Sequence, residues 1–255
     1  MRVLTLNVCG LRASQKKGLF SWLKRQKADY ICLQEVRASE KQIESNLFSI
    51  DGYVRYSSVA EKKGYSGVCI YTKHEPIKIA DNFGSDFFLK EGRFISLDYK
   101  KHRIVSVYFP SGSSSEERQK IKYKFMSKFE IYLKSILKDK KISIICGDWN
   151  IAHKKIDIKN WRSNQKNSGF LPEERNWMDK IVDKFGFIDA FRQINNLPDQ
   201  YTWWSNRGRA WEKNVGWRID YNIVTPNIKD IILKVKIYKE KRFSDHSPLI
   251  IDYDL

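Results

Sequence analysis

Short apolar segments rich in Val, Ile, Tyr and Phe recur along the chain and predict β-strands. The segment ISIIC at residues 142–146 is apolar apart from Ser143 and shows no alternation of polar and apolar positions, which is typical of a strand covered on both faces. We therefore expect two facing sheets with helices outside them. The predicted strands are residues 2–8, 30–34, 67–72, 93–99, 103–109, 142–147, 219–225, 231–238 and 248–253.

Three segments have the periodicity of a helix: residues 116–138, residues 173–185 and, more weakly, residues 16–27. Acidic residues open the first, and a proline followed by two glutamates opens the second, as helix starts favour. The sequence has no internal repeat, low-complexity tract or long linker, so we expect one domain over residues 1–255. In the first helix the apolar positions are Ile121, Phe125, Phe129, Leu133 and Leu137.

The chain is strongly basic, with 47 Lys and Arg against 30 Asp and Glu and a formal net charge of +17. Such an excess favours a polyanionic partner, because basic side chains release the counterions of nucleic acid. A solvated basic surface kept for solubility is the alternative. The hydrophobic fraction of 42% is enough for a full core. No apolar run is long enough to cross a membrane, and no signal peptide is evident, so we expect a cytoplasmic protein.

The four cysteines, Cys9, Cys32, Cys69 and Cys146, are scattered, and most of them fall inside predicted strands. Their spacing matches no zinc or disulfide pattern. We therefore expect reduced thiols in a reducing compartment.

Polar residues interrupt or end several of the predicted strands. Any one of them alone could be a turn or cap residue. Together they predict side chains that converge on one cleft, since loops at strand ends commonly carry function. The six residues are Asn7, Glu35, Tyr108, Asp148, Asp220 and His246.

The residue types in this set favour a magnesium- or manganese-dependent site. Glu35 and Asn7 offer hard oxygen donors, and no cysteine or histidine cluster accompanies them, which argues against zinc. Asp148 and Asn150 would project the same way if the backbone is extended, which suits attack on a phosphate. The carboxylate that orients His246 should come from a distant residue, and Asp220 is the candidate.

Seven strings in the chain closely resemble the exonuclease III and AP endonuclease family, in the order and with the spacing of that family. This resemblance implies an α/β four-layer sandwich, with two facing, mostly antiparallel β-sheets flanked by helices, as in deoxyribonuclease I. The strings are LNVCGLRA at 6–13, LQEVR at 33–37, GYSGV at 64–68, VYFPSG at 107–112, GDWNIAH at 147–153, NVGWRIDY at 214–221 and SDHSPL at 244–249.

The resemblance also implies an activity: Mg²⁺-dependent hydrolysis of DNA 5′ to an abasic site, leaving a 3′-OH, with 3′–5′ exonuclease and 3′-end-cleaning activity. We also expect that Mn²⁺ can replace Mg²⁺ as the cofactor. The partner is double-stranded DNA with abasic sites or blocked 3′ ends, and the protein is expected to be a monomer. By resemblance, Glu35, Asn7 and Asp245 form the metal site, while Asp148, Asn150, Tyr108, His246 and Asp220 are catalytic.

The family positions that wall a pocket for a base-free sugar correspond to Trp203, Trp217 and Ile219. Trp204 and Trp211 are expected to be ordinary core. The predicted DNA contacts are Arg12, Arg37, Lys63, Tyr65, Arg118, Asn164, Asn167 and Arg207.

One departure from the family pattern concerns Cys9, which stands where relatives usually carry Asp or Asn. Magnesium disfavours sulfur, so we expect that Cys9 is not a ligand.

Three alternative functions remain: an enzyme acting mainly at DNA 3′ ends, a noncatalytic DNA-damage-binding protein, and a lipid or inositol phosphatase of the same fold.

Overall fold

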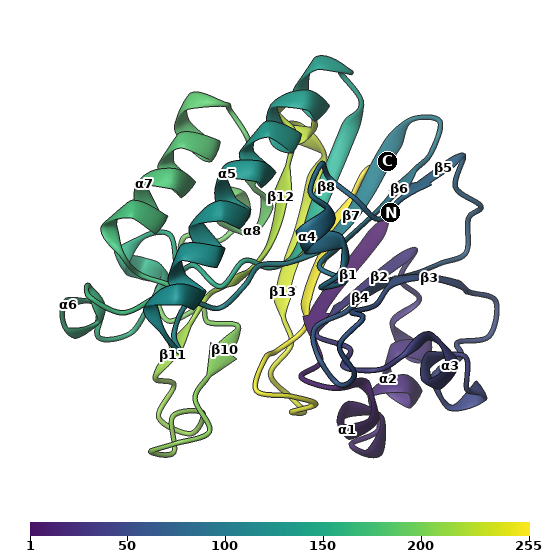
Figure 1. Ribbon diagram of the computed structural model, residues 1–255, viewed down its shortest axis with the longest axis horizontal. Coiled ribbons are helices and arrows are strands. Elements are labelled where there is room, and N and C mark those ends of the chain that lie inside the picture. Colours follow the sequence, from purple (N-terminus) through teal and green to yellow (C-terminus); the bar gives the residue numbers. More distant parts are fainter.

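Two six-stranded sheets face one another in the computed structural model, which describes residues 1–255 apart from the side chain of residue 229 (Figure 1). Each sheet contains one parallel pair, β1 with β2 and β7 with β8, and its other pairs are antiparallel. The first sheet comprises β13 (Ile232–Ile237), β14 (Leu249–Tyr253), β1 (Arg2–Asn7), β2 (Tyr30–Gln34), β4 (Val68–Thr72) and β3 (Val54–Ser58) in spatial order. The second comprises β5 (Lys78–Ala80), β6 (Phe94–Asp98), β7 (His102–Tyr108), β8 (Ile142–Asp148), β12 (Asp220–Val224) and β9 (Ile188–Asp189).

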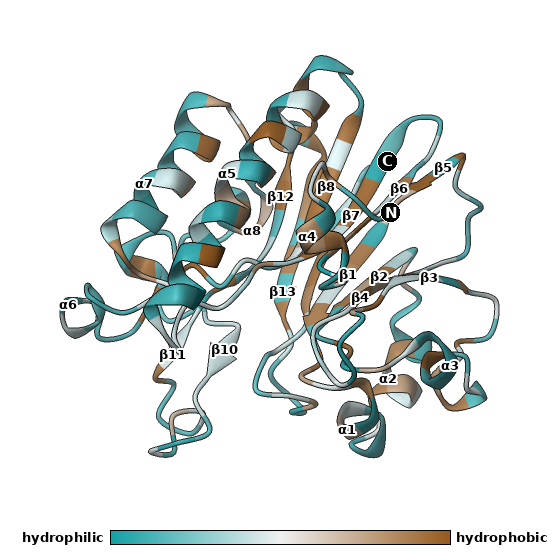
Figure 2. Ribbon diagram, in the orientation of Figure 1, coloured by the Kyte–Doolittle hydropathy of each residue, from teal (hydrophilic) through white to brown (hydrophobic). Residues whose placement is uncertain are grey.

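Helices cover the outer face of each sheet, so the expected four-layer α/β sandwich is confirmed. On the first sheet lie α1 (Leu11–Lys16) and α2 (Leu19–Gln26), and on the second lie α5 (Glu116–Lys138) and α7 (Pro172–Asp179). Figure 2 shows hydrophobic residues concentrated in the strands between these helical layers. Shorter helices are α3 (Glu40–Ile43), α4 (Asp86–Leu89), α6 (Trp161–Asn164) and α8 (Ala190–Ile194), and a two-stranded ribbon is formed by β10 (Trp203–Trp204) and β11 (Gly216–Trp217).

Strands such as β8 lack polar–apolar alternation because both of their faces are buried. Successive side chains point alternately into the core between the sheets and into the core under the helices. In β8, Ile144 and Cys146 point into the core between the sheets, whereas Ile145 packs under the helices. Burial of both faces is what the ISIIC pattern predicted. All four cysteines are free, and only Cys9 is not fully buried.

The helix predictions hold with two corrections. The helix expected at residues 16–27 is α2, which begins only at Leu19 because Gly18, with a left-handed φ of 83°, separates it from α1. The helix expected at residues 173–185 changes from α to π geometry over Lys180–Lys184. The helix at residues 116–138 has the predicted bounds, and Ser115 caps it by accepting a hydrogen bond from the Arg118 N–H.

In both sheets, alternate side chains point into the core between the sheets. The last inward-pointing side chains of these strands meet at one shared edge. Val3 and Thr5 precede Asn7 on one face of β1, and Ile144 and Cys146 precede Asp148 on one face of β8. The same reasoning applies to Tyr108 at the end of β7 and to Asp220, which pairs with Asp148 across the β8–β12 ladder. The core between the sheets therefore ends in a group of polar side chains.

None of the helices described is long and apolar enough to span a membrane.

Candidate active site

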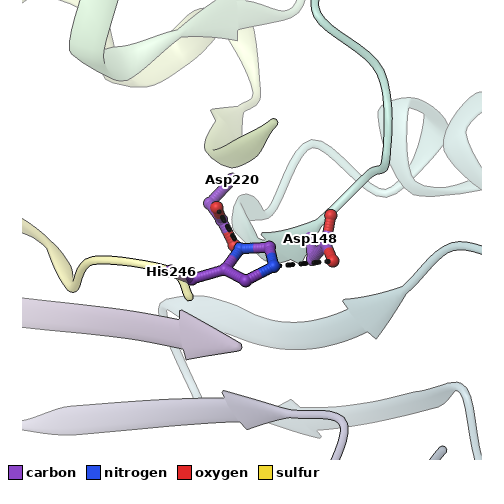
Figure 3. Close-up of side chains that lie close together, drawn as sticks. All are labelled: Asp148, Asp220 and His246. Atoms are coloured by element: carbon purple, nitrogen blue, oxygen red, sulfur yellow. Dashed lines mark hydrogen bonds and ion pairs between the residues drawn. The ribbon is translucent and has the colours of Figure 1, made fainter. Parts of the chain in front are cut away.

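A histidine between two aspartates occupies this edge (Figure 3). His246 Nδ1 lies 2.8 Å from Asp220 Oδ2, and its Nε2 lies 3.9 Å from Asp148 Oδ2. All three side chains are buried. His246 is therefore hydrogen-bonded to Asp220, as the sequence predicted.

Burial and mutual charge shift the pKa values of this group. Burial raises the pKa of Asp148 well above its usual range, since a desolvated carboxyl favours its neutral form. Burial alone would lower the pKa of His246, but the carboxylates of Asp220 and Asp148 outweigh it and raise that pKa. The two carboxylates therefore favour the protonated form of the imidazole.

Asn7 connects two carboxylates at the end of β1. Its Nδ2 donates to Glu35 Oε2 at 2.9 Å and to Asp148 Oδ2 at 2.8 Å. Its Oδ1 accepts a hydrogen bond from the Cys9 backbone N–H at 2.9 Å. Asn7 thus organises the carboxylates around it, whereas the sequence had suggested only a metal ligand.

The oxygen atoms around the rim fit a hard cation. Glu35 has a left-handed backbone conformation and pairs with Arg37. Asp245 Oδ2 accepts a hydrogen bond from Trp203 Nε1 at 3.1 Å, whereas its buried Oδ1 has no hydrogen-bond partner among the described residues. Hard carboxylate oxygens of this kind are the ligands that Mg²⁺ and Mn²⁺ prefer.

Asp148, Asp220 and His246 also present ligand atoms within 4.8 Å of one another and could hold a metal ion. However, His246 Nδ1 is already engaged by Asp220, so the histidine has only Nε2 left for a ligand.

Asn150 reaches Asp148 by a different route from the one expected. Its backbone is left-handed, with φ of 53°, so the extended conformation assumed from the sequence is wrong. Its backbone N–H donates to Asp148 Oδ1 at 2.8 Å, and its Nδ2 lies 3.3 Å from Asp148 Oδ2. Asparagine tolerates this conformation better than most residues. The two side chains therefore still act on one another.

Tyr108 ends β7 beside these groups. Burial, followed by the negative charge of Glu35, raises the pKa of the Tyr108 phenol well above its usual value. The hydroxyl therefore stays protonated and available as a donor. The guanidinium of Arg93 lies 4.9 Å from the centre of the Tyr108 ring.

A cavity of about 870 Å³ opens over this group. Trp203 and Trp217 line it with their rings edge to face, 6.0 Å apart, and Ile219 lies beside them. Behind Ile219, a small apolar cluster contains Ile158 and Phe170. All of the predicted catalytic, metal and sugar-pocket residues except Asp220 line this cavity; they are Asn7, Glu35, Tyr108, Asp148, Asn150, Trp203, Trp217, Ile219, Asp245 and His246.

The predicted DNA contacts are distributed less tightly. Arg37 and Asn167 line the cavity, and Asn164 donates from α6 to the Asn160 carbonyl. Tyr65 accepts a hydrogen bond from Arg118 Nη2 at 2.8 Å, so these two form one cluster outside the cavity. Arg12, Lys63 and Arg207 are exposed and do not line it.

Sequence reasoning missed a buried ion pair behind Asn150. Lys122 Nζ lies 2.5 Å from Glu174 Oε1 and donates to the Asn150 carbonyl at 2.7 Å. Glu174 Oε2 accepts hydrogen bonds from the backbone N–H of Gly169 and of Leu171, which both line the cavity. A signal existed, since Lys122 falls among the apolar positions of the helix at residues 116–138.

Trp204 is buried, as expected of a core residue, whereas Trp211 is only partly buried and packs against it. The sequence also gave no indication of two hydroxyls that support the site. Ser244 Oγ donates to the Asn7 carbonyl at 2.6 Å, and Thr202 Oγ1 accepts from the Asp220 N–H at 3.2 Å.

The fold and this edge site together define the class of phosphate-ester hydrolases built on two facing sheets. The chain belongs to the endonuclease/exonuclease/phosphatase family, whose model matches residues 4–246. It is a nuclease of the exonuclease III-like kind, and so a hydrolase.

Several relatives match over almost the whole chain. The exodeoxyribonuclease of Bacillus subtilis is 38% identical, covering 98% of each chain, and the DNA repair nuclease APEX1 of Danio rerio is 34% identical, covering 98% of this chain and 81% of the relative. The solved structure of an AP endonuclease from Archaeoglobus fulgidus superposes with a TM-score of 0.91 at 26% identity, covering both chains fully. These matches confirm the resemblance drawn from the seven strings.

Proposed function

We propose that this chain hydrolyses the DNA backbone 5′ to an abasic site and leaves a 3′-OH, with 3′–5′ exonuclease and 3′-end-cleaning activity. One observation carries the proposal: Asp148 and His246, with Asp220 behind the histidine, share a single cavity with an oxygen-lined rim and an apolar wall. The histidine and aspartate group suits a phosphate, the oxygen-lined rim suits a cation, and the apolar wall suits a sugar without a base. The names of the AP endonuclease and repair nuclease relatives support the same reading.

The charged residues would divide the work on the phosphate. His246, held as a cation by Asp220, donates from Nε2 to a phosphate oxygen. Asp148, fixed by Asn7 and Asn150, orients the attacking water or takes its proton. Such preorganised groups stabilise charge where it develops in the transition state.

Glu35 and Asp245 would hold Mg²⁺, with Mn²⁺ able to replace it, and Asn7 would fix Glu35 in place. The bound cation would supply Lewis-acid stabilisation of the phosphate charge. Tyr108, kept protonated beside Glu35, donates to another phosphate oxygen.

The apolar wall would select the substrate. A sugar without a base loses no stacking when it leaves the helix, so its extrusion costs less than flipping an intact nucleotide. Trp203, Trp217 and Ile219 would enclose that sugar and exclude a base. The basic residues Arg12, Arg37, Lys63, Arg118 and Arg207, with Tyr65, Asn164 and Asn167, would contact phosphates on either side.

We further propose that the protein acts as a monomer on double-stranded DNA. Four free cysteines suit a reducing compartment such as the cytoplasm.

The test uses end-labelled duplexes, one with a tetrahydrofuran abasic analogue and one with a 3′-phosphate, each with Mg²⁺ and with chelator. We expect Mg²⁺-dependent incision 5′ to the analogue, giving a product that a DNA polymerase extends. An intact analogue duplex after long incubation would overturn the proposal.

A second candidate is an enzyme acting mainly at 3′ ends. It is favoured by the name of the Bacillus subtilis relative, an exodeoxyribonuclease. Rapid trimming or dephosphorylation of 3′ ends, with slow incision at the analogue, would support it.

A further inference from the structure

Arg218 lies directly behind the wall of the sugar pocket. Its neighbours Trp217 and Ile219 both line the cavity. Because successive side chains of an extended segment alternate, Arg218 between them points the opposite way. Its side chain is fully buried.

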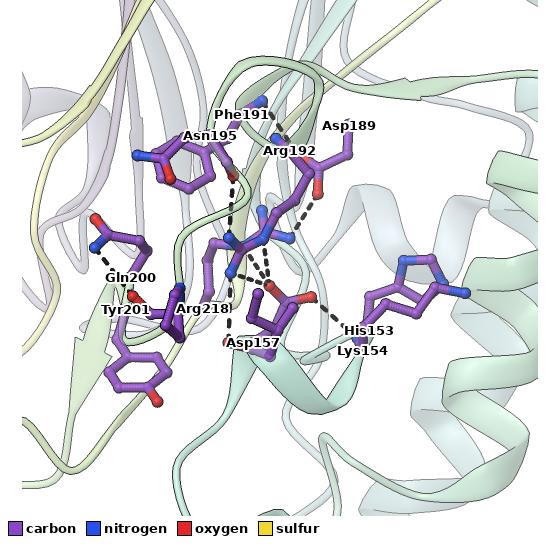
Figure 4. A network of polar contacts seen from close by, with 12 residues as sticks. His153, Lys154, Asp157, Asp189, Phe191, Arg192, Asn195, Gln200, Tyr201 and Arg218 are labelled. Atoms are coloured by element: carbon purple, nitrogen blue, oxygen red, sulfur yellow. Dashed lines mark hydrogen bonds and ion pairs between the residues drawn. The ribbon is translucent and has the colours of Figure 1, made fainter.

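Two aspartates hold the Arg218 guanidinium in a fixed orientation (Figure 4). Its Nε donates to Asp157 Oδ1 at 2.8 Å, and its Nη2 donates to Asp189 Oδ2 at 2.6 Å. The Arg218 backbone N–H also donates to the Asp157 carbonyl at 2.7 Å. Both the main chain and the side chain of Arg218 are therefore tied to Asp157.

The two aspartates are themselves anchored to other elements. Asp157 Oδ1 also accepts from Arg192 Nε at 2.9 Å, and Asp157 Oδ2 accepts from the Lys154 N–H at 3.0 Å. Asp189 caps α8 by accepting from the backbone N–H of Phe191 and of Arg192. These contacts connect the pocket wall to the segment before α6, to β9 and to α8.

Two aromatic rings also lie close to the guanidinium. The Tyr221 ring lies 4.5 Å from Arg218 Cζ, and the Phe191 ring lies 5.5 Å from it. The two carboxylates and the two rings together fix the orientation of the planar Arg218 guanidinium. A lysine ammonium, as a point charge, cannot reproduce that arrangement.

The network reaches the pocket through a second route as well. Ile158, which follows Asp157, forms an antiparallel bridge with Trp217 and packs in the same cluster as Ile219. Movement of Asp157 would therefore displace Trp217 and Ile219, two of the three residues of the wall. The distance between the Trp217 and Ile219 side chains and the phosphate site depends on this attachment.

Stability alone does not account for such a network. Desolvating an arginine and two aspartates costs several kcal/mol per ion, and well-packed apolar residues of similar volume often give an equal or higher stability. The ion network instead provides a fixed geometry, with directions set by hydrogen bonds. Asp157 shows how strongly the group is coupled, since the nearby guanidinium groups outweigh its burial and lower its pKa to about 2.

We propose that Arg218 is a positioning residue that sets the width of the sugar pocket and thereby the preference for a base-free sugar over an intact nucleotide. This inference rests on the proposed function, because it assigns the pocket to an abasic sugar. Arg218 touches neither the phosphate site nor the cavity, so its effect is on selectivity.

The test compares Arg218→Lys with a matched control, Arg103→Lys. Arg103 is also largely buried and also joins two aspartates, with Nε at 2.5 Å from Asp98 and Nη2 at 2.8 Å from Asp139. It lies near the start of β7, whereas Tyr108 at the other end of that strand lines the cavity. Both variants lose a buried arginine fork, but only Arg218→Lys alters the pocket wall.

Two quantities are measured: kcat/KM for incision, and Kd in chelator, on duplexes with and without the tetrahydrofuran analogue. We expect Arg218→Lys to lower the preference for the analogue about tenfold, the effect of one methylene of fit in a pocket. The loss should fall on KM and Kd, with kcat little changed. Arg103→Lys should keep the wild-type preference even though its melting temperature falls.

An unchanged preference in Arg218→Lys, or an equal loss in Arg103→Lys, would overturn the inference. If Arg218→Lys does not fold, Arg192→Gln loosens Asp157 from its more exposed side, and the same criteria apply to it. Failure of the wild-type protein to incise the analogue would instead overturn the proposed function, so the two failures are distinguishable.

Discussion

The buried pair of Lys122 and Glu174 gives the most quantitative prediction. Both side chains have no exposed surface, and the pair joins α5 to α7. Glu174 also accepts a hydrogen bond from the Gly169 N–H in the segment before α7. Lys122→Met removes the ammonium and leaves Glu174 as a buried, uncompensated carboxylate. Glu174→Gln in the same chain removes that charge while keeping an oxygen for the Gly169 and Leu171 N–H groups.

The expected magnitudes follow from the burial. Removing one partner of a buried pair costs about 3–5 kcal/mol, because the other charge is left without a partner. For a chain of this size, that corresponds to a fall in melting temperature of roughly 6–20 °C. The double variant should recover most of the loss, since neither charge remains.

Activity should separate from stability in the double variant. The Asn150 carbonyl has lost the Lys122 donor, so Asn150 is held less firmly against Asp148. A displacement of this kind lowers kcat by roughly 10- to 100-fold. Stability should therefore return while catalysis does not.

The assay combines thermal and denaturant unfolding with incision kinetics in a double-mutant cycle. Lys180→Met is the matched control, because Lys180 also pairs with a carboxylate of α5, Glu130, at 2.7 Å but is partly exposed. That control should cost less than about 1 kcal/mol. A loss in Lys122→Met no larger than in the control, or a fully active double variant, would refute the reasoning.

Three further predictions concern the site and its support. Asp148→Ala should abolish incision while largely preserving duplex binding, measured by gel shift in chelator; retained turnover would remove Asp148 from its role. Cys9→Asp should strengthen cation binding, measured by Mn²⁺ titration with electron paramagnetic resonance; an unchanged affinity would show that the thiol does not limit it. Asp157, whose folded-state pKa is lowered to about 2, should contribute about 2 kcal/mol of stability above pH 4, lost as the pH falls toward 2. Unfolding free energies of the wild type and Asp157→Asn should therefore converge in acid, and a constant difference would contradict this.

The apolar pattern predicted most of the fold because these strands and helices bury large side chains. Residues 142–146 and 116–138 are clear cases, where continuous or four-residue spacing follows directly from the packing. β3 was missed because its sequence, VRYSS, is mostly polar. β5, β9, β10 and β11 have three or two residues each, too short for a pattern.

The candidate site could be predicted in its membership but not in its geometry. Strand ends predicted that Asn7, Tyr108 and Asp148 converge, and alternation along the strands explains why. The left-handed backbone of Asn150 depends on tertiary contacts, including the Lys122 hydrogen bond, and no local pattern indicates it. The partners of Arg218 lie 61 and 29 residues away, so only the folded chain identifies them.

Hydrolysis in ¹⁸O-labelled water tests the central claim most directly, because the claim is that the Asp148–His246 group directs a water at a DNA phosphodiester. A duplex with the tetrahydrofuran analogue is incised with Mg²⁺, and both fragments are weighed by mass spectrometry. The account predicts one ¹⁸O in the 5′-phosphate beside the analogue and an unlabelled 3′-OH on the other fragment. Label in a 3′-phosphate, or cleavage without incorporation of label, would contradict it.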